Sequence, residues 1–149
     1  MKVSKNFYLE EMVPRNMYEI HGDKCIHLID DRIIEIAQIL RDEFGVMVAN
    51  TWYYFKEPNG DEDNYRGWRP WDYVSKGKEK VKFSAHKFGR AIDLISPKRD
   101  IEEMRQHIID HHKEKFSLIR RIEGRVNYLH VDVANTMTDE LIMFSPPLD

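Results

Sequence analysis

The chain has 149 residues, enough for one domain with a substantial core and too few for two comfortable ones. Apolar residues make up 42% and charged residues 33%, as is typical of a soluble globular protein. The formal net charge of -3 argues against a broad basic surface for nucleic acid, and so against a nuclease.

Cys25 is the sole cysteine, which excludes an internal disulfide and a cysteine-rich zinc site. The opening MKVSKNFYLEEM lacks the apolar stretch and small-residue cleavage site of a secretory signal. No apolar run is long enough for membrane insertion as a helix. We therefore expect synthesis in the cytoplasm.

The first third of the sequence predicts two helices and one strand. Residues 4–13 suit a short apolar helix that Ser4 caps and Pro14 ends, and residues 15–25 have no clear period and suggest a loop. Residues 30–44 carry apolar side chains at helical spacing and precede Gly45, which makes this the clearest helix. Residues 46–55 are β-branched and aromatic, which favours a strand.

A long polar connection, residues 56–82, leads to the second half of the chain. A helix is predicted for residues 100–113, where Asp100 and Glu103 resemble a capping box. His107 and His111 lie four apart on it, and we interpret them as a solvated face rather than a metal pair. Strands are predicted for residues 116–122 and 128–133, joined by a turn at Glu123, and for residues 140–144.

Residues 84–93, SAHKFGRAID, hold the main candidate site. Asp93 stands among apolar neighbours, where an ionised carboxylate needs a cationic partner. Zinc is a natural candidate because it takes imidazole nitrogen and carboxylate oxygen, and His86 supplies a second ligand. Seven residues separate the two, too many for one helix face, so we expect a loop that turns at Gly89 and enters a strand near Arg90.

A third ligand is predicted in the strand of residues 128–133. Its sequence, YLHVDV, alternates so that Tyr128, His130 and Asp132 share one face. His130 is the expected ligand. The alternative to a metal site is that His86 is a hydrogen-bonded loop histidine and Asp93 forms an ordinary ion pair.

The pattern S-x-H-x-x-G-x-A-x-D, followed some 40 residues later by YLHVD, resembles the zinc D-alanyl-D-alanine carboxypeptidase and L-alanyl-D-glutamate endopeptidase family. Many phage endolysins belong to that family, and the Hedgehog signalling domain shares its fold. The resemblance covers residues 4–133. It implies a zinc metallopeptidase that cuts peptidoglycan stem peptides and reaches the cell wall after lysis or phage release.

The resemblance also suggests substrate-binding residues. The Gly-Trp-Arg run ending at Arg69 resembles the family's Ser-Gly-Tyr-Arg element, whose arginine points at a substrate carboxylate, with Arg66 as the second choice. An exposed arginine stacked on a tryptophan is the alternative for Arg69. Ser84 is expected to assist in the loop or at the substrate carboxylate, and Tyr128 to stack on the substrate or donate its hydroxyl, unless it is simply packed.

Hydrolysis also needs a general base. In many family members an acid stands three residues before the last histidine, and here that position is Asn127. Glu123 is the predicted base and Asp132 an assisting carboxylate that orients an imidazole or a water. Their alternatives are a turn residue and a cross-strand ion-pair partner.

Together these features predict one α+β domain over residues 1–149. A small antiparallel sheet carries the metal site, and the helices of residues 30–44 and 100–113 cover its other face. The expected function is zinc-dependent hydrolysis of cell-wall peptides. Two other classes are open: a zinc-stabilised binding module without turnover, and a nucleic-acid binder using the following side chains: Arg66, Arg69, Lys76, Lys78, Lys80 and Lys82.

Overall fold

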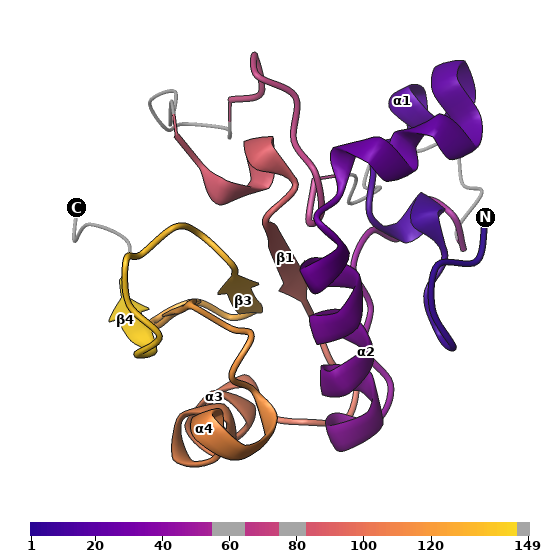
Figure 1. The fold of residues 1–149 in the computed structure, drawn as a ribbon. Coiled ribbons are helices and arrows are strands. Elements are labelled where there is room, and N and C mark those ends of the chain that lie inside the picture. Colours follow the sequence, from indigo (N-terminus) through magenta and orange to yellow (C-terminus); the bar gives the residue numbers. More distant parts are fainter. Residues whose placement is uncertain (55–64, 75–82, 146–149) are drawn as a thin grey trace.

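The computed structural model describes residues 1–54, 65–74 and 83–145. Helices and a small four-stranded sheet form an α+β fold, which confirms the predicted class (Figure 1). In chain order the elements are η1 (Leu9–Glu11), α1 (Arg15–His21), η2 (Gly22–Leu28), α2 (Asp31–Phe44), η3 (Ala85–Phe88), β1 (Ala91–Leu94), α3 (Ile101–Asp110), α4 (His112–Lys115), β2 (Arg121–Glu123), β3 (Leu129–Asp132) and β4 (Ile142–Phe144). No helix in the described part of the chain is long and apolar enough to cross a bilayer.

The strand order is β1-β3-β2-β4. β3 pairs antiparallel with both of its neighbours, whereas β4 pairs parallel with β2. The sheet is therefore mixed, and the prediction of a wholly antiparallel sheet was wrong in its last strand. β3 ends beside the start of β2. The chain then passes to the other side of β2 and enters β4 at the same end, so β4 runs parallel to β2.

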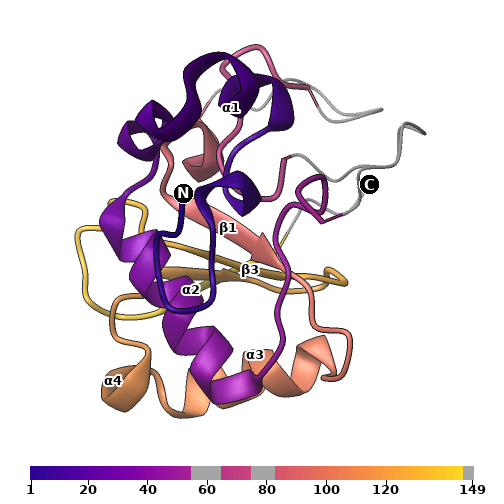
Figure 2. The same ribbon diagram turned by 90° about the vertical axis from the view of Figure 1, so that its right-hand side faces the viewer.

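α2 forms where the sequence predicts it. The Asp30 carboxylate caps it by accepting the backbone N–H of Arg32 at 3.1 Å, and Gly45 ends it with a φ of 86°. Its buried stripe packs on the sheet face formed by Ile92, Leu94, Leu129 and Val131. Figure 2 shows α2 lying across this face, which leaves the opposite face of β1 and β3 for polar side chains.

Two predictions for the N-terminal third were wrong. Residues 15–25, predicted as a loop, lie in α1 and η2, because Pro14 stands at the N-cap of α1 with a suitable φ of -63° instead of ending a helix. Residues 46–54 form no strand and pair only through the bridge between Val48 and Ile95. Instead the Trp52 indole N–H donates to the Val13 carbonyl at 2.9 Å, so this segment is bonded to the N-terminal part of the chain.

Other elements are shorter than predicted. The helix expected over residues 4–13 is reduced to η1, although its apolar side chains are buried. The helix of residues 100–113 is interrupted at His111 and continues as α4. Phe116 and Ile119 are buried in the core ahead of β2, so only the end of residues 116–122 is strand. The long connection is described only for residues 65–74.

Candidate metal centre

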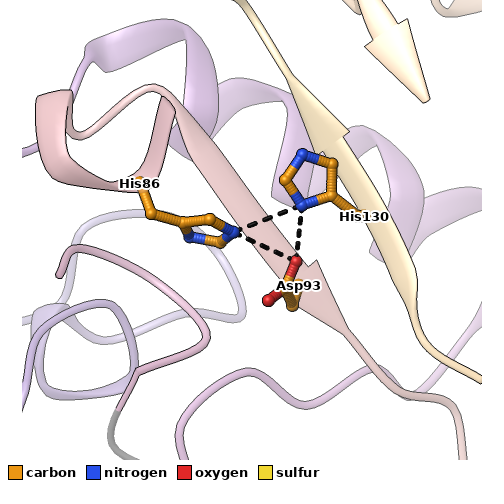
Figure 3. Close-up of side chains that lie close together, drawn as sticks. All are labelled: His86, Asp93 and His130. Atoms are coloured by element: carbon orange, nitrogen blue, oxygen red, sulfur yellow. Dashed lines mark hydrogen bonds and ion pairs between the residues drawn. The ribbon is translucent and has the colours of Figure 1, made fainter. Parts of the chain in front are cut away.

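His86, Asp93 and His130 come together on the polar face of the sheet (Figure 3). η3 carries His86, while Asp93 and His130 stand directly opposite each other on β1 and β3. His130 Nδ1 lies 2.7 Å from Asp93 Oδ1, and His86 Nε2 lies 3.2 Å from both of these atoms. All three residues are buried.

Gly89 makes the turn that brings His86 back towards Asp93. It adopts a left-handed conformation with a φ of 67°, which favours glycine. A Cβ built on it would lie 1.8 Å from the Leu28 carbonyl oxygen, and the Gly89 carbonyl in turn accepts the N–H of Asp30. The turn is thus fixed against the segment that precedes α2.

A backbone carbonyl orients the His86 ring. Nδ1 lies 2.7 Å from the Gly67 carbonyl oxygen, which can only accept, so we assign the ring proton to Nδ1. Gly67 itself packs against Met12 so closely that a Cβ would lie 2.1 Å from the Met12 carbonyl oxygen. Nε2 therefore presents its lone pair to Asp93 and His130.

A carboxylate orients the His130 ring. Nε2 lies 3.2 Å from Oδ2 of Asp132, so a proton on Nε2 is held there and Nδ1 faces Asp93. Ligand histidines in metalloproteins commonly donate their second N–H to a carboxylate in this way. Asp132 thus orients His130 from the side away from the cluster.

The three atoms suit a small divalent cation. A tetrahedral zinc ion with bonds of about 2.0–2.1 Å holds its ligand atoms roughly 3.3 Å apart, close to the separations of 2.7 and 3.2 Å in the cluster. Two imidazole nitrogens and one carboxylate oxygen are donors that zinc accepts, with a fourth position left to water. These residues could hold a metal ion, and the donors alone do not select zinc over other transition metals.

Electrostatics favour a cation between these groups. Burial lowers the pKa of His86, which keeps its imidazole neutral. Burial also opposes charge on His130, but hydrogen bonds to Asp132 and Asp93 outweigh it and raise its pKa to about 9. The pKa of Asp93 falls well below its usual range in spite of burial, because both imidazoles face it. Without a metal, a proton on His130 and the Arg69 guanidinium supply the positive charge that faces Asp93.

Glu123 stands beside the cluster at the end of β2. Its Oε2 lies 4.0 Å from His130 Nδ1, and its side chain is 13% exposed. The Tyr128 hydroxyl lies 3.5 Å from the same oxygen, and burial raises the Tyr128 pKa to about 12, which keeps the hydroxyl protonated. Among the predicted carboxylates, Glu123 is therefore the one on the side of His130 that faces the cluster.

The two predicted arginines have different surroundings. Arg69 donates from Nη2 to Asp93 Oδ2 at 2.5 Å, so its guanidinium borders the cluster. Arg66 donates from Nη1 to the Ala49 carbonyl at 3.0 Å, and its own carbonyl accepts the Asp93 N–H at 2.7 Å. Arg66 thus supports the loop and β1 through its backbone, which the sequence did not indicate.

The remaining predicted residues lie outside the cluster. Ser84 is the N-cap of η3 and makes no side-chain capping bond. Asn127 is exposed in the bend between β2 and β3. His107 contacts Glu43 at 2.8 Å, and the described residues contain no second group suited to a metal. The predicted Lys76, Lys78, Lys80 and Lys82 lie outside the described residues.

Sequence reasoning missed two residues behind His130. Arg121 contacts Asp132, and Phe144 packs against the His130 ring. The alternation of Arg121, Ile122 and Glu123 indicates a half-buried strand with both charges on one face, a signal that could have found Arg121. Nothing in the local sequence points to Phe144.

No protein-family model, curated protein or solved structure gave a match to this chain.

Proposed function

We propose that this protein is a zinc-dependent hydrolase of bacterial cell-wall peptides, of the D-alanyl-D-alanine carboxypeptidase or L-alanyl-D-glutamate endopeptidase type. The observation that carries the proposal is the convergence of His86, Asp93 and His130, which are distant in sequence and match the ligand positions of the family that the motif resembles. The substrate is a peptidoglycan stem peptide, reached after lysis or phage release.

The chemistry divides between the ion and Glu123. A zinc ion lowers the pKa of a water that it binds and polarises a carbonyl oxygen. Glu123 accepts the proton of the attacking water and delivers it to the leaving amine. Its distance of 4.0 Å from His130 Nδ1 supports this role, because it places the carboxylate within reach of a water bound at the cluster. Its 13% exposure leaves it reachable by substrate.

Arg69 is the proposed anchor for a substrate carboxylate. Its side chain is 23% exposed, and a guanidinium can bind a carboxylate through two parallel hydrogen bonds. Stem peptides carry free carboxylates. The ion pair with Asp93 holds Arg69 at the edge of the centre and also draws one oxygen of Asp93 away from the histidines. Tyr128, whose hydroxyl lies 3.5 Å from Glu123 Oε2, is the proposed hydroxyl donor to the substrate.

The test is hydrolysis of purified peptidoglycan, followed by mass spectrometry of the released peptides. We expect bound zinc at about one ion per chain, loss of hydrolysis on chelation and recovery on adding zinc. His86→Ala should abolish both zinc binding and hydrolysis. His107→Ala is the matched control, because His107 pairs with Glu43 outside the centre. Hydrolysis that survives chelation or His86→Ala would rule the proposal out.

A zinc-stabilised wall-binding module is the second candidate. The amide at Asn127 favours it, since many members of the resembled family have an acid at that position. In the segment of residues 68–71, Trp68 is buried in the core, whereas Trp71 is 54% exposed and lies edge-on to Phe88. Zinc-loaded protein that sediments with cell walls and releases no peptide would identify such a module. Replacing Trp71 by alanine should then weaken sedimentation.

A further inference from the structure

Arg121 binds both oxygens of Asp132, the carboxylate behind His130. Its Nε lies 3.0 Å from both oxygens of Asp132, and its Nη2 lies 2.8 Å from Oδ2. The Ala134 N–H donates to Oδ1 at 3.0 Å. Asp132 is fully buried, so these donors and His130 Nε2 hold the carboxylate in a single orientation.

Phe144 confines the same imidazole from another direction. Its ring stands at 90° to the His130 ring, with 5.5 Å between the centroids. The Arg121 guanidinium lies over the Phe144 ring, with its Cζ 5.0 Å from the ring centroid. β4 delivers Phe144 through its parallel pairing with β2, which places Phe144 opposite Glu123.

We propose that Arg121 and Phe144 are positioning residues that hold His130 in the orientation of a metal ligand. The inference rests on the proposed metal centre. Neither residue contacts the three ligand atoms; both act through His130. β2 and β4 thus contribute no ligand, yet they fix the direction of one.

The physical reason is that a histidine ring has two side-chain torsions to fix. The bond from Nε2 to Asp132 sets the direction of the ring in its plane, and it does so only while Asp132 is itself held. The Phe144 ring limits rotation of the imidazole out of that plane. Loss of such outer partners commonly weakens metal binding by about 10–100-fold.

The experiment compares Arg121→Lys and Phe144→Leu with two matched controls. A lysine ammonium cannot bridge both carboxylate oxygens as a guanidinium does. Arg120→Lys changes the neighbouring arginine, which pairs with the exposed Asp139, and Met143→Leu changes the neighbouring residue of β4. The readouts are the zinc dissociation constant by chelator competition, the absorption spectrum of the cobalt(II) form, and the melting temperature of the metal-free protein.

We expect both test variants to bind zinc about 10–100-fold more weakly and to show an altered cobalt spectrum, and both controls to match the wild type. A wild-type zinc constant and spectrum in Arg121→Lys would overturn the role of Arg121. If Arg121→Lys does not fold, Phe144→Leu on the edge strand decides alone, by the same two readouts. A wild-type protein that binds neither metal would instead remove the metal centre itself.

Discussion

Glu123 and Asp132 flank the His130 imidazole from opposite sides. Oε2 of Glu123 lies 4.0 Å from Nδ1, the nitrogen that faces the cluster, whereas Oδ2 of Asp132 lies 3.2 Å from Nε2. Asp132 is fully buried and bound by Arg121, while Glu123 is partly exposed. The two carboxylates are therefore suited to different roles, proton transfer for Glu123 and orientation for Asp132.

Replacing Glu123 by glutamine should separate metal binding from catalysis. Glutamine has nearly the same shape but cannot accept the proton, so peptide hydrolysis should fall by about 10²–10⁴-fold. The zinc dissociation constant should stay within a few-fold of the wild type, because Glu123 is not a ligand. Glu140→Gln, at an exposed glutamate paired with Lys113, is the control. Full activity of Glu123→Gln would show that another residue is the general base, with Asp132 as the next candidate.

Arg69→Ala should reduce recognition of a free carboxylate. A charged hydrogen bond contributes about 1.5–3 kcal/mol, so kcat/KM for a peptide with a terminal carboxylate should fall by about 10–100-fold. The matching carboxamide peptide should be affected much less. Because Arg69 also bonds Asp93, bound zinc must be measured in the same samples. An equal loss on both peptides at full zinc content would contradict carboxylate binding. Arg99→Ala, at an exposed arginine, serves as control.

Gly89→Ala should damage both the fold and the metal centre. The left-handed φ of 67° and the contact with the Leu28 carbonyl oppose a side chain there, and the turn connects two ligands. Gly22→Ala is the matched control, since Gly22 also has a positive φ of 55° but open space around it. Strain at either position costs about 1–3 kcal/mol. Denaturation should show a loss in both variants, whereas zinc titration should show weaker binding only in Gly89→Ala.

Asp30→Asn tests a charge at the start of α2. The hydrogen bond from the Arg32 side chain is the main cause of the lowered pKa of Asp30, and it outweighs burial. Since the folded-state pKa lies below the usual value of 3.8, the charge stabilises the fold above pH 3.8. This stabilisation is lost as the pH falls through the folded-state pKa.

Asparagine keeps the N-cap acceptor and removes the ion pairs with Arg32 and Arg90. We expect a loss of about 0.5–1 kcal/mol in unfolding free energy at pH 7, shrinking towards zero in acid. Urea denaturation at several pH values measures it. Asp30→Ala should cost about 1 kcal/mol more at every pH because it also removes the cap. A pH-independent difference between aspartate and asparagine would contradict the assignment.

Much of the centre follows from local sequence. The turn at Gly89 and the alternation of residues 128–133 are short-range signals, and they bring His130 onto one face with Asp132. The apolar side chains at helical spacing in α2 and its capping residues are short-range signals as well. The cross-strand position of Asp93 and His130 follows once the two strands pair in the register that buries their apolar side chains.

The remainder depends on contacts between distant segments. Residues 15–28 have no apolar period, and their helices are stabilised by packing of side chains such as Cys25 and Tyr18 on the core. Residues 46–54 have strand propensity, but Trp52 bonds to Val13 in the N-terminal segment, a long-range contact that the local sequence does not reveal. Phe144 reaches His130 only because β4 pairs with β2, a choice between strand neighbours that local sequence does not encode.

Because Asp93 pairs directly with His130, the register of β1 against β3 also decides whether the candidate ligands meet. Side chains alternate between the two faces of a sheet. A shift of β1 by one residue would therefore place Asp93 in the hydrophobic core under α2, while His130 stayed on the polar face. A chain folded that way has no chelating pocket. A tightly bound ion would therefore favour this strand register, since only molecules with the two strands correctly paired gain its binding free energy.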